Sequence, residues 1–390
     1  MSRTREITLA FLKIGLTAYG GLAAIWGILQ ADLQEKRGWL SRERFLEGLA
    51  LVNMLPGATA VQLCIFIGHA RGGWQGGLLA GLCFILPAFL IMLALTLAYS
   101  AFGAMPAVSG ALHGLGPVVI VIFLAAIWRL SKNAVTAPAQ LALVVAGALA
   151  AALSPLGTAW IVLMAGAIGV ALFHSLRHGA MALLVLFACS AVPMPSLLTG
   201  LAGNGQQPGG LLGMGAFFLT VGALSFGGGL SMIAFIQEQV VNQYHWLTQR
   251  EFIDGLALGQ VTPGPILMVS AYVGYKLAGL PGAALAYAAI FLPAFVLMLG
   301  ILPVFERVRR LQWTRAAVKG ISPAVIGVLL VTLGQMAPHA VSDGFGVLVF
   351  VLAAAAILAW KATPVKTLFG GALAGALRER LGPLLSPVRV

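Results

Sequence analysis

Two short stretches of this chain repeat one another and hold the residues best suited to chemistry. Glu47 to Thr59 reads Glu-Gly-Leu-Ala-Leu-Val-Asn-Met-Leu-Pro-Gly-Ala-Thr, and Asp254 to Pro265 reads Asp-Gly-Leu-Ala-Leu-Gly-Gln-Val-Thr-Pro-Gly-Pro. Each stretch places a carboxylate, an apolar helical run, an amide and a Pro-Gly pair in the same order. Proline lacks an N–H and crowds the preceding turn, and glycine lets the backbone turn. We therefore expect a broken helix in both stretches.

A helix that starts just after a Pro-Gly turn directs free N–H groups and the positive end of its dipole at whatever lies there. Such an end binds anions without a dedicated arginine. Nearby glycines allow close backbone approach, and hydroxyl and amide side chains supply further donors. The predicted substrate site, suited to a compact oxyanion, consists of Lys13, Thr17, Gly20, Gly21, Asn53, Pro56, Gly57, Thr59, Ser225, Gly227, Gly228, Gln260, Thr262, Pro263 and Gly264.

A plainer interpretation is that these glycines and prolines only kink helices and let them pack. Their repetition favours function, because a helix broken within lipid leaves backbone groups that only protein or a watery cavity can satisfy. Lys13 also has two interpretations: a counter-charge for the substrate, or a side chain that reaches back to the membrane surface.

Glu47 and Asp254 occupy the same position in the two stretches, a few residues inside each apolar segment. A carboxylate within a membrane is a functional candidate, here for proton coupling. The alternative is an interfacial carboxylate paired with a neighbouring arginine, Arg44 or Arg250.

Composition places the chain in a membrane. It has 390 residues, of which 60% are hydrophobic and 9% charged, with a mean hydropathy of +0.99. This is typical of a polytopic all-α membrane protein. The net charge of +12 comes from short Lys/Arg clusters between apolar runs, which argues against a nucleic-acid partner. We predict no cofactor and no metal site, since ligand spacings and nucleotide loops are missing from the sequence.

The elements that position these residues form an internal repeat. At an offset of 207 positions, Phe218, Gly222, Phe226, Gly227 and Gly228 match Phe11, Gly15, Tyr19, Gly20 and Gly21. After the Pro-Gly break the offset becomes 206, where Leu292 to Phe295 matches Leu86 to Phe89. Such similarity predicts two homologous halves, residues 1–192 and 211–390, joined by a linker at 193–210.

Hydropathy predicts about 12 or 13 transmembrane segments. If every segment spans, seven separate the starts of the two repeats, and an odd number makes the repeats inverted. Re-entrant hairpins at the Pro-Gly segments would invalidate this counting. With the N-terminus inside, most Lys and Arg residues lie inside, and the loop from Lys36 to Arg44 and the C-terminal tail are the exceptions. Paired broken helices in inverted repeats are typical of transporters, with substrate held near the midplane.

At these residues the chain resembles the chromate ion transporter family in its long, two-domain form. The similarity rests on Phe-Leu-Lys-Ile-Gly-Leu-Thr-Ala-Tyr-Gly-Gly, Trp-Leu-Ser, Phe-Leu-Glu-Gly-Leu-Ala-Leu, Leu-Pro-Gly and Phe-Ile-Leu-Pro-Ala-Phe, with their second copies. Family members typically read Pro-Gly-Pro at the break. The second break does so, whereas the first has Ala58 in the last position, and Leu22 stands where the family often has proline.

The resemblance implies a multi-pass protein of the bacterial inner membrane that exports chromate and confers chromate resistance. We expect a secondary active transporter driven by the membrane potential, by proton coupling or by both. Its partners would be chromate or a related oxyanion and the lipid bilayer, and the sequence is compatible with a homodimer. The alternatives are a carrier or channel for sulfate or another anion, and a membrane-embedded enzyme, for which the sequence shows no nucleophile or metal cluster.

Overall fold

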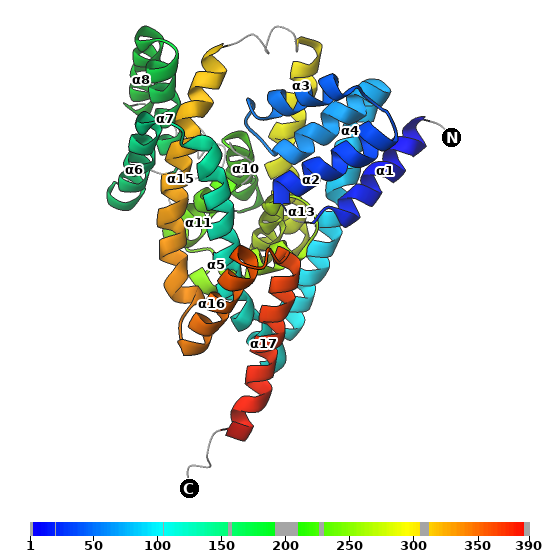
Figure 1. Cartoon of the computed structure of the whole chain (residues 1–390), viewed down its shortest axis with the longest axis vertical. Coiled ribbons are helices and arrows are strands. Elements are labelled where there is room, and N and C mark those ends of the chain that lie inside the picture. The colour runs from blue at the N-terminus through cyan, green and yellow to red at the C-terminus, as the bar shows by residue number, and fades with distance from the viewer. Residues whose placement is uncertain are drawn as a thin grey trace.

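The structure is a computed structural model that describes residues 3–19, 21–103, 105–154, 158–191, 210–225, 230–304 and 312–385. All regular elements in these ranges are helices, as Figure 1 shows. The predicted linker at 193–210 lies outside the described residues except for Gly210, which begins a helix.

The first repeat opens with a helical hairpin. Helix α1 (Arg3–Thr17) runs to a turn, and the chain returns through α2 (Gly21–Leu29) and the π-helical segment η1 (Gln30–Lys36). The return is evident from the indole N–H of Trp39, which donates to the carboxylate of Glu6 at 3.1 Å. Helices α1 and α2 therefore run antiparallel.

The first Pro-Gly segment forms a second hairpin. Helix α3 (Arg42–Val52) leads to the break, and α4 (Thr59–Phe102) leads away from it. The two pack against each other, since a Cβ added to Gly48 would lie 2.6 Å from the ring of Phe66. The guanidinium of Arg44 also lies 5.4 Å from the centre of that ring. This segment is therefore re-entrant, with its tip at the break.

Helix α4 consists of two legs that fold back on each other. Gly73 has a φ of +63°, which an L side chain rarely adopts, and the chain reverses there. Gly68 and Gly76 then face each other so closely that a Cβ on Gly68 would lie 2.4 Å from the Gly76 carbonyl oxygen. The second leg, residues 74–102, is about 43 Å long at 1.5 Å per residue, enough to cross a hydrocarbon core of about 30 Å.

The second repeat has the same elements in the same order. They are α10 (Gly210–Ala223), α11 (Leu230–Gln237), η2 (Glu238–Gln243), α12 (Gln249–Val261), η3 (Ile266–Met268) and α13 (Val269–Ile301). Helix α13 reverses at Gly279, whose φ of +62° repeats that of Gly73. A Cβ on Gly255 would lie 2.5 Å from the ring of Tyr272, so α12 and the first leg of α13 also form a re-entrant hairpin.

The two repeats are inverted, as predicted. The second legs of α4 and α13 run antiparallel: the Tyr287 hydroxyl donates to the Ile85 carbonyl at 2.7 Å, and Leu299 lies against Gly77. We call the open end of the hairpins in each repeat its base. The first base holds Glu6, Trp39, Arg44 and Arg71, next to the start of the second leg of α4, whereas Tyr99 at the far end of that leg contacts Asp254 near the second base. The bases therefore lie on opposite membrane faces.

The remaining helices interlock the repeats. They are α5 (Pro106–Ala134), α6 (Pro138–Leu153), α7 (Thr158–Phe173), α8 (Leu176–Ala191), α15 (Gln312–Ala340), α16 (Gly344–Leu358), α17 (Pro364–Leu385) and the short η4 (Leu302–Val304). Helix α5 packs on α16 and α17, and its counterpart α15 packs on α6 and α7. Glycines make these contacts close, for a Cβ on Gly114 or Gly320 would clash with backbone of the neighbouring helix at Gly371 or Gly169.

Four described helices are long and apolar enough to cross a membrane: Thr59–Phe102, Pro106–Lys132, Ile266–Ile301 and Trp313–Ala340. Shorter apolar helices pack around them. Exposed leucines follow one face of α4 at helical spacing, including Leu82, Leu86 and Leu90. An exposed face of this kind is suited to lipid, which agrees with the prediction of an all-α polytopic membrane protein.

Candidate functional site

The hairpin tips of one repeat meet those of the other at the centre of the molecule. The Gly57 N–H donates to the carbonyl of Ser225 at 2.6 Å, and the Gly264 N–H donates to the carbonyl of Ala18 at 2.9 Å. Gly57 and Gly264 are equivalent positions, and so are Ala18 and Ser225, so the two bonds are a reciprocal pair. We call them the tip clasps. Each clasp joins the second hairpin of one repeat to the first hairpin of the other.

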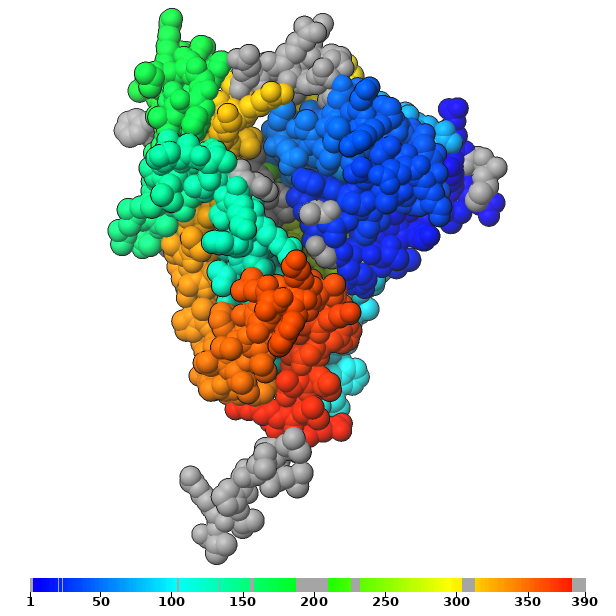
Figure 2. All heavy atoms as spheres, in the orientation of Figure 1, coloured from blue at the N-terminus to red at the C-terminus, as the bar shows by residue number. Residues whose placement is uncertain are grey.

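A cavity of about 70 Å³ lies beside these clasps. Its lining comes from three tips, with Ala18, Tyr19, Gly21, Leu22 and Ile25 from the first hairpin, Ala58, Thr59 and Ala60 from the start of α4, and Gly259, Gln260, Thr262, Gly264, Pro265, Ile266 and Leu267 from the second Pro-Gly break. A water molecule needs about 10–15 Å³ of such space, so the cavity has room for several waters or one small polyatomic ion. Figure 2 shows that the visible face of the molecule is hollowed between the blue hairpins of the first repeat, α5, and α16 with α17.

The start of α4 gives this cavity its chemical character. Ala58 precedes the helix without a side-chain cap, so the first N–H groups of α4 have no helical partner. The Thr59 side chain is 3% exposed, and its hydroxyl has no hydrogen-bond partner within the described residues. The start of η3 and α13, at Ile266 and Leu267, faces the same cavity. Two helix starts and a free hydroxyl suit an anion.

The predicted site residues that the structure describes divide into three groups. Gly21, Thr59, Gln260, Thr262 and Gly264 line the cavity, while Pro56, Gly57, Pro263 and Ser225 form the breaks and clasps around it. Ser225 is 1% exposed and its hydroxyl lacks a partner in the described part of the chain. Gly20, Gly227 and Gly228 lie outside the described residues.

The third group does not line the cavity. Lys13 and Thr17 are exposed on α1, and the Thr17 hydroxyl donates to the Lys13 carbonyl at 2.9 Å. Asn53 is exposed at the end of α3, where its amide donates to the carbonyl of Leu49 at 2.7 Å. Asn53 and Gln260 therefore differ in surroundings although they are paired in the sequence.

Sequence reasoning missed Gln62, which is fully buried in the first turns of α4. Its side-chain N–H donates to the carbonyl of Pro56 at 2.7 Å, and a Cβ on Gly57 would lie 2.6 Å from that nitrogen. The signal was present as a lone amide in the apolar run Ala-Val-Gln-Leu-Cys six residues after the break. Spacing in the sequence does not show that the Pro-Gly turn folds back over this side chain.

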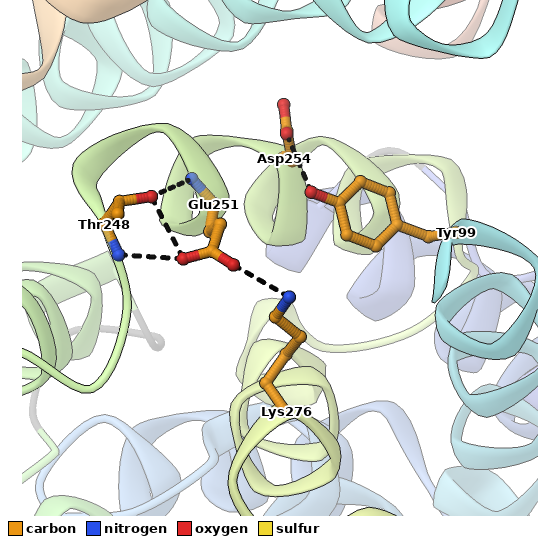
Figure 3. A network of polar contacts seen from close by, with 5 residues as sticks. All are labelled: Tyr99, Thr248, Glu251, Asp254 and Lys276. Carbon is orange, nitrogen blue, oxygen red and sulfur yellow. Dashed lines mark hydrogen bonds and ion pairs between the residues drawn. The ribbon is translucent and has the colours of Figure 1, made fainter. Parts of the chain in front are cut away.

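The paired carboxylates of the repeats both have partners. Glu47 is partly exposed and lies 2.9 Å from Arg44. Asp254 is 5% exposed, lies 3.4 Å from the Arg250 guanidinium, and accepts a 3.1 Å hydrogen bond from the Tyr99 hydroxyl. Figure 3 shows this contact, which joins α12 of the second repeat to α4 of the first.

A second ion pair closes the second base. Lys276 lies 2.7 Å from Glu251, which also accepts bonds from the N–H and hydroxyl of Thr248 (Figure 3). The Glu251 N–H donates back to the Thr248 hydroxyl at 3.2 Å, completing a capping box at the start of α12. Burial raises the pKa of Glu251, but the bonds from Lys276 and Thr248 outweigh burial and leave that pKa below its usual value.

Inverted repeats, paired helix breaks that meet at the centre, and a small cavity suited to an anion are features of a membrane transporter. The chain belongs to the chromate transporter family, whose sequence profile matches residues 5–170 and 212–376. The two matched regions correspond to the two repeats.

Relatives that are named as chromate transport proteins match most of the chain. It is 32% identical to the chromate transport protein of Cupriavidus metallidurans, over 94% of this chain and 91% of the relative. It is 33% identical to the chromate transport protein of Pseudomonas aeruginosa, over 90% and 86%. It is 30% identical to the probable chromate transport protein of Synechococcus elongatus, over 86% of each chain. No solved structure matches the chain significantly.

Proposed function

We propose that this protein is a secondary active transporter that exports chromate from the cytoplasm and so confers chromate resistance. The observation that carries the proposal is the cavity at the tips, where the uncapped start of α4 lies opposite the second Pro-Gly break and includes Thr59, whose buried hydroxyl has no partner within the described residues. Family membership supports chromate as the anion.

In this proposal the substrate is held by backbone N–H groups at the starts of α4 and of η3 with α13, and by the side chains of Thr59 and Gln260. Pro56, Gly57, Pro263 and Gly264 shape the breaks. Lys13, Thr17 and Asn53 are left out of the proposed contacts because they are exposed and do not line the cavity. Neutral donors would bind the dianion firmly enough to select it and still allow release, since the described residues that line the cavity include no lysine or arginine.

The distribution of charge supports the proposed direction of transport. Seven basic residues belong to the first base and the segments beside it, namely Arg3, Arg5, Lys36, Arg37, Arg42, Arg44 and Arg71, whereas Arg250 and Lys276 are those of the second base. The excess of positive charge favours a cytoplasmic first base in a bacterial inner membrane. The re-entrant hairpins return the loop from Lys36 to Arg44 to the N-terminal face, which removes one exception to the positive-inside pattern. An inside-negative potential then favours expulsion of a dianion by about 4.6 kcal/mol per 100 mV.

Proton coupling is proposed at Asp254 rather than at Glu47. Asp254 is buried and its contact with Tyr99 crosses between repeats, whereas Glu47 is partly exposed and paired within its own helix. A proton exchanged at Asp254 would therefore alter a contact that changes when the repeats move relative to each other.

The test is uptake of labelled chromate into everted vesicles from cells that express the chain, with and without an energised membrane. Energy-dependent accumulation above empty-vector vesicles is expected, and accumulation equal to that control would contradict chromate export. Excess sulfate in a parallel assay separates a chromate carrier from a general carrier of tetrahedral dianions. Replacement of Asp254 by Asn should remove the response of uptake to an imposed pH gradient while uptake driven by potential persists.

A further inference from the structure

In both tip clasps a glycine N–H donates to a backbone carbonyl of the other repeat, but the side chain that lies behind the glycine differs. In the first break, one peptide group links Pro56 and Gly57, and both of its ends are engaged. Its carbonyl accepts the Gln62 amide at 2.7 Å, and its N–H donates to Ser225 of the other repeat at 2.6 Å. A fully buried side chain thus fixes the orientation of the peptide that makes the first clasp.

The second break lacks this support. After the one-residue offset change, Met268 is the counterpart of Gln62, and its methyl group lies against Gly264 as the Gln62 amide lies against Gly57. Methionine fills the space but donates no hydrogen bond to the carbonyl of Pro263. Among the described residues, the Gly264 clasp to Ala18, at 2.9 Å, therefore has no side-chain hydrogen bond behind it.

We propose that Gln62 is a positioning residue that strengthens the first tip clasp, and that its replacement by Met268 in the second repeat biases the resting orientation of the carrier. Inverted repeats exchange roles when a carrier reorients, so exact symmetry would make the two orientations equal in energy. Because Gln62 supports the first clasp with a hydrogen bond and Met268 does not so support the second, the two orientations differ in energy. The proposal rests on the proposed function only in requiring a carrier with two orientations.

The experiment reads the orientation of the empty carrier. Cys64, Cys83 and Cys189 are replaced by alanine, and Gly259, which lines the cavity and has free space around an added Cβ, becomes the single cysteine. A membrane-impermeant maleimide is applied to right-side-out and to everted vesicles. The ratio of the two labelling rates then reports which face reaches the cavity.

Gln62→Met should change this ratio at least about fivefold, because it leaves the Pro56 carbonyl without its buried partner. Met268→Gln should change the ratio in the opposite direction, and the double exchange should reverse the parental bias. Gln140→Met is the matched control: it removes another buried glutamine, which caps α6 far from the tips, and should leave the ratio unchanged.

Ratios within twofold of the parent for both Gln62→Met and Met268→Gln, or shifts in the same direction, would overturn the proposal. Should Gln62→Met fail to fold, Met268→Gln alone still decides, because it adds a group to an otherwise intact site. In uptake assays Gln62→Met should lower the maximal rate and leave KM within about twofold, as expected for a group that does not contact substrate. Labelling is measured without substrate, so a shifted ratio with no chromate uptake contradicts the proposed function only, and normal uptake with an unchanged ratio contradicts this inference only.

Discussion

At the scale of single residues, the site depends on two glycines and one hydroxyl. Gly57 and Gly264 have φ values of +122° and +108°, which side-chain-bearing residues rarely adopt. Their N–H groups make the tip clasps, so the same backbone conformation both breaks the helix and joins the repeats. Thr59 adds a buried hydroxyl that has no partner within the described residues, a costly arrangement unless a ligand or water uses it.

Replacement of Gly57 or Gly264 by leucine should abolish transport while the protein still inserts. The positive φ alone costs about 1–3 kcal/mol, and the new Cβ would meet Gln62 or Met268 at 2.6 Å or 2.5 Å. The measurement is chromate uptake at matched expression. Gly27→Leu is the control, because Gly27 has open space around it and no positive φ. Normal uptake by both tip variants would contradict a site at the breaks.

Thr59→Val should raise the KM for chromate by about tenfold or more, since a hydrogen bond to a charged group contributes about 1.5–3 kcal/mol. Valine keeps the shape of threonine and removes only the hydroxyl. Thr262→Val is the matched control: Thr262 lines the same cavity, but its hydroxyl already donates to the Leu258 carbonyl at 2.9 Å. Equal KM changes in the two variants would show that the Thr59 hydroxyl has no special role.

At the scale of elements, each repeat works through hairpins that present their tips at the centre and their charged bases at a membrane face. Close glycine contacts hold the legs together, as at Gly274 and Gly282, where either Cβ would approach the other's carbonyl oxygen within 2.3 Å. Ion pairs and caps then fasten the bases. Apolar packing alone would not fix how deeply each hairpin lies in the membrane, whereas a polar base keeps the open end of the hairpin at the membrane surface.

The ion pair between Lys276 and Glu251 should stabilise the protein at neutral pH and not in acid. Because the pKa of Glu251 is lowered in the folded protein, its stabilisation is complete above the unfolded pKa of about 4.3 and is lost as the pH falls below it. Lys276→Met should therefore lower the midpoint of thermal unfolding at pH 7, by an amount equivalent to about 1 kcal/mol or less, and have a shrinking effect below pH 4.

Thermal unfolding in detergent across this pH range measures the effect. Lys366→Met, which changes an exposed lysine of α17, is the control for the loss of one positive charge. A destabilisation by Lys276→Met that stays constant down to pH 3 would mean that its cause is packing and not the ion pair.

At the scale of the whole molecule, the inverted repeats make the two membrane faces structurally equivalent but electrically different. The first base carries the larger number of basic residues, and the second base carries Asp254 and Glu251 beside Arg250 and Lys276. Helix α5 of the first half packs on α16 and α17 of the second, and α15 of the second half packs on α6 and α7 of the first. These contacts prevent either half from moving as an isolated body. Reorientation is therefore expected as a concerted movement of hairpins against α5 and α15.

Cysteines at equivalent positions should report opposite faces. Glu35 and Asn242 are matched by the repeat, and both are exposed. In chains that lack native cysteines, Glu35→Cys should react with an impermeant maleimide only in everted vesicles, and Asn242→Cys only in right-side-out vesicles. Labelling of both from one face would contradict the inverted arrangement, and exchange of the two results would reverse the proposed orientation.

Much about this protein follows from local properties of the chain. Hydropathy, the repeat and the Pro-Gly breaks identify an all-α membrane protein with two related halves, because proline and glycine act on their own backbone and apolar runs partition on their own. Tertiary structure alone decided that the breaks are tips of re-entrant hairpins, because a break ends a helix but does not set the direction of the next one. The repeats remain inverted because the first two segments of the first repeat are both hairpins and do not cross the membrane. Two crossings are removed from the seven counted between the repeat starts, and the number stays odd. Contacts such as Tyr99 with Asp254, Gly57 with Ser225 and Gln62 beneath its turn join groups that sequence spacing cannot relate, since their distances depend on how the two repeats pack.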